Sequence, residues 1–178
     1  FQNLKIADFG LLKRDERRIH QTMLMSRRGT NPYMAPCLFL GNDDELMRAD
    51  SKVDVWSLGI VIYRMTSHQY PFDPNNDLDI KKFMEQYSQT RVLIRPPIIT
   101  DNLLWDLLKK MLSFDRSLRI SASEALLHPF LTNVQSLKEI TPEQMQLAQT
   151  AEKSQFNGDA SISKFDLNPL FAFPLVEK

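Results

Sequence analysis

The most continuous hydrophobic pattern of the chain lies at residues 53–65, where the sequence VDVWSLGIVIYRM is apolar on nearly every side of a helix. Helices of this kind are buried centrally rather than laid on a surface, because they have no polar face to turn to solvent. The pattern therefore predicts a core helix. The side chains expected inside the core are Trp56, Leu58, Ile60, Val61 and Ile62.

Further helices are expected along the rest of the chain. A more polar one is predicted at 78–87, and apolar residues at helical spacing over 102–112 predict another with one face on the core. The sequences SASE at 121–124 and TPEQ at 141–144 are capping boxes, in which side chains satisfy the free amides of a helix start. Each box predicts a helix that begins directly after its first residue.

The first part of the chain is less regular. Residues 3–7 alternate apolar with polar positions and lead into Asp8-Phe9-Gly10, which predicts a short strand ending in a glycine turn. Residues 11–34 show no period and are dense in basic and hydroxyl side chains, so they are expected to form a long mobile loop. Structureless loops of this length inside compact domains are usually functional. A short helix is expected to close at residues 38–40, and an acidic surface turn follows at 41–45.

Composition narrows the functional class. A chain of 178 residues with 43% hydrophobic content is long enough for one packed domain. Lysine plus arginine equal aspartate plus glutamate at 22 each, so no overall field indicates a nucleic-acid or membrane-surface binder. The single cysteine, Cys37, excludes a disulfide framework and fits a reducing, cytoplasmic compartment. The chain starts at Phe1 rather than methionine, and we expect it to be cut from a longer protein.

Four motifs then occur in a recognisable order: KIADFG, GTNPYMAPC, SKVDVWSLGIVIYRM and LLKKMLSFDRSLRISASEALLHPF. Their order and spacing resemble the large, carboxy-terminal lobe of a eukaryotic protein kinase of the serine/threonine type. The resemblance implies a mainly α, protein kinase-like fold with only the large lobe present and a short residual β strand before Asp8. It covers residues 1–131 as one domain part, and leaves 132–178 as an extension with one polar helix and a loose tail.

The resemblance assigns roles around the Asp-Phe-Gly motif. Asp8 matches the aspartate that binds the Mg²⁺ bridging the phosphates of ATP, a task that suits a carboxylate. Phe9 resembles the ring whose packing sets active and inactive states, and Gly10 resembles the hinge of the activation loop. Without this context, an aspartate before a glycine would be read as the cap of a turn.

The loop after this motif holds a candidate phosphorylation site. Ser26 lies three residues before Gly29, where related kinases carry an activating phosphate. A phosphate there would pair with neighbouring arginines and order the loop, which implies an upstream kinase acting on Ser26 or Thr30. A solvated basic loop is the alternative.

Gly29, Thr30 and Tyr33 resemble the segment that cradles a protein substrate beside its phosphorylated residue. A threonine at Thr30 is typical of serine/threonine kinases. The same residues are also compatible with a plain surface turn, stiffened by Pro32 and Pro36.

Cys37 departs from the family, which has a glutamate after the Ala-Pro pair and binds it to an arginine matched here by Arg119. Losing one partner of a buried ion pair costs about 3–5 kcal/mol, because the other charge stays uncompensated. Either Arg119 has another acceptor, or this lobe is less rigid than its relatives. A reactive thiol and a small buried hydrophobe are both open for Cys37, and the second is the more common role of a free cysteine.

Two residues of the core helix are assigned structural roles. Asp54 matches a buried aspartate that binds the catalytic-loop backbone in the family, although a first-turn carboxylate favoured by the helix dipole is the simpler interpretation. Trp56 is expected in the core under either interpretation. His20, His68 and His128 lack metal-ligand spacing with any carboxylate or cysteine partner.

Phosphoryl transfer also needs a glycine-rich loop, a lysine–glutamate pair and a catalytic-loop aspartate, and in the family all of these precede Asp8. We therefore predict that the chain is part of a kinase that transfers the γ-phosphate of ATP to protein hydroxyls, and that the isolated fragment has no catalytic base and is inactive. The alternative is a non-catalytic pseudokinase module that serves as a scaffold. In either case the core helix would lose the upstream helix that covers it, which predicts an exposed apolar patch and poor solubility.

Overall fold

The computed structural model describes residues 23–25, 30–41 and 47–172 of the chain. These residues form two compact units, one ending at His128 and the other starting at Pro129. The strand predicted at residues 3–7 and the acidic turn at 42–45 lie outside the described residues. In the part that is described, no helix is both long and apolar enough to cross a membrane.

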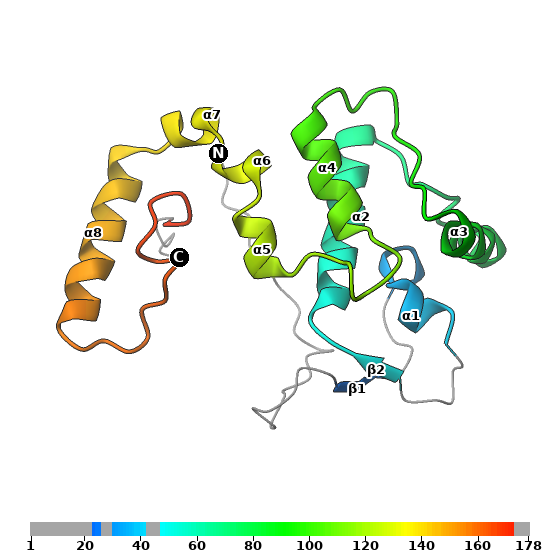
Figure 1. Cartoon of the computed structure of the whole chain (residues 1–178), viewed down its shortest axis with the longest axis horizontal. Helices are drawn as coiled ribbons and strands as arrows, with labels where there is room; N and C mark the ends of the chain where they lie inside the picture. Colours follow the sequence, from blue (N-terminus) through cyan, green and yellow to red (C-terminus); the bar gives the residue numbers. More distant parts are fainter. Residues whose placement is uncertain (1–22, 26–29, 42–46, 173–178) are drawn as a thin grey trace. The chain divides into compact units, whose positions relative to one another are not determined.

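The first unit is mainly helical, with one small sheet (Figure 1). Its strands are β1 (Met23–Met25) and β2 (Met47–Ala49), which pair antiparallel with Met23 opposite Ala49. Its helices are η1 (Asn31–Tyr33, a 3₁₀ turn), α1 (Pro36–Phe39), α2 (Lys52–Ser67), α3 (Asp77–Thr90), α4 (Asn102–Met111) and α5 (Ala122–Leu126).

The expectation of a structureless loop over 11–34 is wrong at Met23–Met25, and the strand Met47–Ala49 was not expected at all. Strands of three residues are too short to show a period of two. What makes them strands is their pairing with each other across more than twenty residues, and sequence-local patterns carry no information about that pairing.

The prediction of a core helix is confirmed by α2, which is longer than its pattern at both ends. Trp56 and Ile60 are each 1% exposed, as expected, and Ile62 is half-buried. The prediction is wrong for Leu58 and Val61, which are 49% and 37% exposed. An all-apolar helix is buried all round only where elements pack on every side of it, and α2 packs on η1 and α4.

The other helices of this unit follow the predicted patterns, with α3 longer than the predicted 78–87 and α4 one residue shorter than the predicted 102–112. In α4 the expected core face is present, because Trp105, Leu107, Leu108 and Met111 are buried. The polar helix α3 begins at an Asn76 cap, whose side chain accepts from the amides of Leu78 and Asp79. The capping box at Ser121 is formed as predicted and starts α5.

The second unit holds α6 (Pro129–Thr132), α7 (Val134–Lys138) and α8 (Pro142–Phe156). The predicted capping box at Thr141 is present and starts α8. The segment after α8, expected to be loose, is held against that helix at two points. Gln155 Nε2 donates to the Ile162 carbonyl at 3.4 Å, and Gln144 Nε2 donates to the Pro169 carbonyl at 3.1 Å.

The tail also makes a contact between aromatic rings. Phe165 and Phe171 pack edge to face with ring centroids 5.9 Å apart.

Candidate substrate-binding site

The predicted site residues fall into two groups. Asp8, Phe9, Gly10, Ser26 and Gly29 lie outside the described residues, so their assigned roles stay predictions. The structure does describe the rest, which are Thr30, Tyr33, Cys37, Asp54, Trp56 and Arg119.

The segment predicted to cradle a substrate forms the short turn η1. Thr30 precedes it in an extended conformation, and the Tyr33 amide donates to the Thr30 carbonyl at 3.0 Å. A proline at the start of the turn fixes its backbone without needing an amide partner. Thr30 is exposed, and its hydroxyl does not cap the turn.

Two side-chain hydrogen bonds fix this turn to its neighbours. Ser57 Oγ on α2 donates to the Tyr33 carbonyl at 2.7 Å. Asn31 Nδ2 donates to both carboxylate oxygens of Asp77, at 2.9 Å each, in the first turn of α3. The turn η1 is thus held between α2 and α3.

The Tyr33 ring places its hydroxyl in a polar cluster that sequence reasoning missed. The hydroxyls of Tyr33 and Tyr70 are 2.7 Å apart, and Arg64 Nη1 donates to the Tyr33 oxygen at 3.1 Å. The Arg64 guanidinium also lies over the Tyr70 ring, 4.9 Å from its centroid. The three residues come from η1, α2 and the loop after α2, so no local motif joins them.

The pKa shifts in this cluster have the shared hydrogen bond as their largest cause. The hydrogen bond with Tyr70, assisted by Arg64, lowers the pKa of Tyr33, whereas the same hydrogen bond raises the pKa of Tyr70. Either hydroxyl can be the donor of this bond.

A cavity of about 480 Å³ opens beside this cluster, lined by Tyr33, Val61, Arg64, Met65 and His68. On the other side of Tyr70 a row of aromatic rings runs into the core. Successive ring centroids are 5.2–6.1 Å apart. The row consists of Tyr70, Phe72, Phe83, Tyr87 and Phe114.

Arg119 is buried and has other hydrogen-bond acceptors in place of the missing glutamate. It is 1% exposed and donates to three backbone carbonyls. These are Ser113 at 3.0 Å, Lys52 at 3.0 Å and Phe114 at 3.4 Å. The guanidinium also lies 5.0 Å from the ring centroid of Trp56. Within the described part of the chain Arg119 has no ion pair, and burial lowers its pKa.

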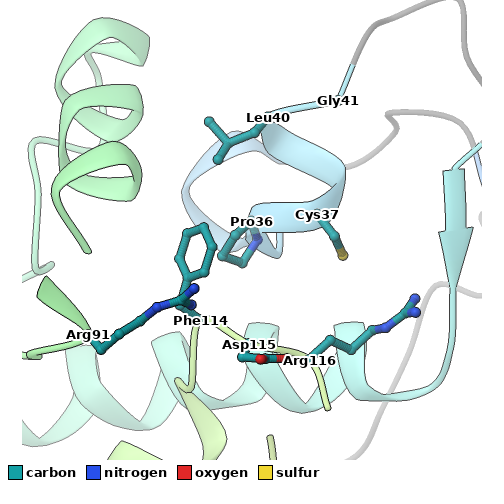
Figure 2. Close-up of a pocket in the computed structure, with 8 residues that line it drawn as sticks. All are labelled: Pro36, Cys37, Leu40, Gly41, Arg91, Phe114, Asp115 and Arg116. Atoms are coloured by element: carbon teal, nitrogen blue, oxygen red, sulfur yellow. The ribbon is translucent and has the colours of Figure 1, made fainter. Parts of the chain in front are cut away.

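Cys37 is a free, half-buried cysteine on α1. It lines a second cavity, of about 410 Å³, opposite the loop that carries Phe114 and Arg116 (Figure 2). In this view the Phe114 ring reaches towards Pro36, and Arg91 lies 4.8 Å from the centroid of that ring. Burial raises the pKa of the Cys37 thiol, which keeps it protonated and favours the role of a small hydrophobe.

Asp54 and Trp56 differ in how they match their assigned roles. Trp56 is buried as predicted. Asp54 is exposed rather than buried. It lies in the first turn of α2, where the positive end of the helix dipole stabilises its negative charge. Partial desolvation raises the pKa of its carboxyl. A contact between Asp54 and a catalytic loop stays a prediction.

A metal site was expected only at Asp8. In the residues for which the structure gives positions, no three or more His, Cys, Asp or Glu side chains gather closely enough to hold a metal ion. None of the described residues is therefore assigned to Mg²⁺.

Comparison with known proteins agrees with the motifs. The model of the protein kinase domain matches residues 1–131. Calcium-dependent protein kinase 4 of Plasmodium falciparum is 36% identical over 128 residues, which are 72% of this chain and 22% of that protein. Serine/threonine-protein kinase cds1 of Schizosaccharomyces pombe is 36% identical over 146 residues, or 79% of this chain and 30% of that protein.

Testis-specific serine/threonine-protein kinase 3 of Mus musculus is 35% identical over 134 residues, which are 74% of this chain and 46% of that protein. The chain thus spans less than half the length of each of these curated relatives.

Proposed function

The chain belongs to the protein kinase family, and on this premise we propose that it is the carboxy-terminal part of a serine/threonine kinase. The whole protein would transfer the γ-phosphate of ATP to serine and threonine hydroxyls of a protein substrate. Catalysis of this transfer depends on positioning and electrostatic stabilisation more than on covalent chemistry.

The observation that carries this proposal is the way in which the substrate segment is held. Its backbone is fixed to α2 through Ser57 and to α3 through Asp77, while Thr30 at its head is exposed to solvent. A surface that must align a substrate hydroxyl needs such a rigid support, because misplacement by about 1 Å can cost roughly 100-fold in rate. A simple connecting turn has no need of anchors on two helices.

Protein kinases use ATP and Mg²⁺, and we assign the metal-binding role in this chain to Asp8. No residue of the chain is proposed as the catalytic base, since the base precedes the Asp-Phe-Gly motif in the family. We also keep Ser26 and Thr30 as proposed targets of an upstream kinase, on the basis of the arginines around them.

A non-catalytic scaffold remains the second candidate, and Cys37 is the observation that favours it. The ion pair with Arg119 that relatives carry is replaced here by bonds to backbone carbonyls. Because those carbonyls satisfy the guanidinium, the replacement does not by itself argue for loss of activity.

Phosphate transfer by the full-length natural polypeptide tests the choice between the two. The polypeptide is incubated with γ-labelled ATP, Mg²⁺ and a mixture of serine- and threonine-containing peptides. We expect transfer, and a fall of roughly 100-fold or more in Asp8→Asn, because a charge that stabilises the transition state is lost.

The matched control is Asp73→Asn, an exposed aspartate outside the substrate segment, which should keep the wild-type rate. A folded wild-type protein that transfers no phosphate, or an Asp8→Asn variant with unchanged rate, would favour the scaffold.

A further inference from the structure

Three of the five residues that line the cavity beside Tyr33 have polar side chains. Its polar lining comes from the Tyr33 hydroxyl, the Arg64 guanidinium and the His68 ring, and no aspartate or glutamate appears among the described residues that line it. The nearby carboxylate of Asp77 does not line the cavity and already accepts two hydrogen bonds from Asn31. The cavity therefore lacks an acidic group of its own.

Arg64 has most of its donors to spare. A guanidinium carries five N–H groups and no acceptor. One hydrogen bond from Arg64, to the Tyr33 hydroxyl, accounts for a single N–H group. The side chain is exposed and forms no ion pair with a described residue, so its charge is available to a ligand.

The tyrosine pair adds a further donor. The Tyr33 oxygen accepts from Arg64, and the Tyr33 and Tyr70 hydroxyls share one hydrogen bond in which either can be the donor. Two hydroxyl protons serve this one bond, so one O–H group of the pair is left for a third group, and Arg64 has no acceptor. A ligand that supplies acceptor atoms would satisfy both this O–H group and the spare N–H groups of Arg64.

The guanidinium is also held in place before any ligand arrives. Its hydrogen bond to Tyr33 and its position over the Tyr70 ring fix two ends of the group. An arginine that is already oriented loses less conformational freedom on binding, and its planar fork matches a carboxylate or a phosphate.

We propose that this cavity binds an anionic side chain of the protein substrate, with Arg64 as the residue that pairs with its carboxylate or phosphate. The inference rests on the proposed function, because it takes Gly29, Thr30 and Tyr33 as the segment that cradles the substrate. It goes further by naming the substrate class: serine or threonine sites with an acidic or already phosphorylated residue near the acceptor.

Peptides that differ at one flanking position provide the test. The full-length polypeptide is assayed against peptides with a fixed acceptor serine, in which each flanking position carries alanine, aspartate, phosphoserine or arginine in turn. At one position we expect aspartate or phosphoserine to raise kcat/KM about 10-fold over alanine, the gain typical of a hydrogen-bonded charge pair. Comparing aspartate with phosphoserine shows which anion the cavity prefers.

Variants of Arg64 link that preference to the cavity. Arg64→Ala should bring the ratio of aspartate to alanine peptides to about one, and Arg64→Glu should turn the preference towards arginine. Arg64→Lys keeps the charge but loses the fork, so it should keep only part of the preference. Lys81→Glu is the control, since it makes the same charge reversal on an exposed residue of α3 outside the cavity.

Direct binding of the labelled peptides, measured by fluorescence anisotropy, separates this inference from the proposed function. Phosphate transfer without any acidic preference, or with a preference that Arg64→Ala leaves intact, overturns the inference while the kinase function stands. Tighter binding of the aspartate peptide that is lost in Arg64→Ala supports the inference even where no phosphate is transferred. Absence of both transfer and selective binding overturns both.

Discussion

At the scale of single residues, Arg119 shows how a buried charge can persist without a counterion. Three backbone carbonyls accept from its guanidinium, and the face of the Trp56 ring adds a favourable electrostatic contact. Burial lowers the pKa of the group, but a guanidinium does not lose its proton in proteins. The full positive charge therefore stays in the core, stabilised by carbonyl dipoles and by the face of the Trp56 ring.

This environment leads to a prediction for Cys37→Glu. Arg119 is already desolvated in the native protein, so only the new carboxylate has to be taken out of water. We expect Cys37→Glu to raise the free energy of unfolding by about 1–3 kcal/mol, the range of hydrogen bonds to charged groups.

Urea denaturation followed by tryptophan fluorescence measures this change. Cys37→Gln is the matched control, because it has the same length and lacks the charge. Equal unfolding free energies for the two variants would show that no ion pair with Arg119 forms and that the cavity merely accepts a longer side chain.

The residue scale also shows what the sequence could reveal. Arg119 and Cys37 were paired from motif positions alone, and the need for a replacement acceptor followed from the cost of an isolated charge. The acceptors themselves are main-chain carbonyls, which every residue has, so no residue type marks them. The contact of Arg64 with Tyr33 and Tyr70 was missed because it depends on how η1 packs on α2.

At the scale of elements, α2 and α4 pack closely against each other at Gly59. A Cβ atom placed there would lie 2.8 Å from Leu112 Cδ2 and 3.2 Å from Met111 Cβ. Leu112 and Met111 are 1% and 2% exposed, so neither side chain has free space to move into. Glycine at this position allows the two helices to pack together.

Gly59→Ala therefore sets two effects against each other. Alanine favours the helix by about 1 kcal/mol over glycine, whereas overpacking a core costs about 1–3 kcal/mol. Because the clash involves the branched part of a fully buried leucine, we expect overpacking to win, with a net loss of about 1 kcal/mol in urea denaturation.

The double variant Gly59→Ala/Leu112→Ala tests the cause. Removing the leucine side chain leaves room for the new methyl group. The double variant should therefore lose less unfolding free energy than the two single variants lose together. Additive losses would mean that the methyl group is accommodated elsewhere and that the close approach of α2 and α4 is not limiting.

Elements were predictable where their signals are local. The boxes at Ser121 and Thr141 identified two helix starts correctly, because capping joins residues only three positions apart. The strands Met23–Met25 and Met47–Ala49 were not predicted, because each is a strand only by pairing with the other. The exposed face of α2 was not predicted for another reason. A helix pattern shows which residues are hydrophobic, but it does not show which neighbouring elements cover them.

At the scale of the whole molecule, that exposed face is a continuous feature. Leu58, Val61 and Met65 are spaced by three and four residues, so they lie on one side of α2, and they are 49%, 37% and 66% exposed. The exposed apolar patch predicted from the sequence is thus present. Contiguous apolar surface on a soluble protein is usually a site of contact with other protein.

Replacing the two most exposed members of this row should improve the behaviour of the isolated 178-residue chain. We expect the wild-type chain to bind the dye ANS and to associate as its concentration rises. Leu58→Gln/Met65→Gln should reduce dye binding several-fold and raise the concentration at which the chain stays monomeric. The midpoint of urea denaturation should change little, because surface substitutions usually alter stability by less than about 0.5 kcal/mol.

Ile60→Gln provides the contrast, since this neighbour on the same helix is 1% exposed and should lose the fold when a polar amide is buried. A wild-type chain that stays monomeric at high concentration and does not enhance ANS fluorescence would contradict the prediction. A double variant that lost stability like Ile60→Gln would show that Leu58 and Met65 support the core of this unit. If only association is relieved, the row on α2 is a contact surface, and the stability of the lobe comes from the face that packs on η1 and α4.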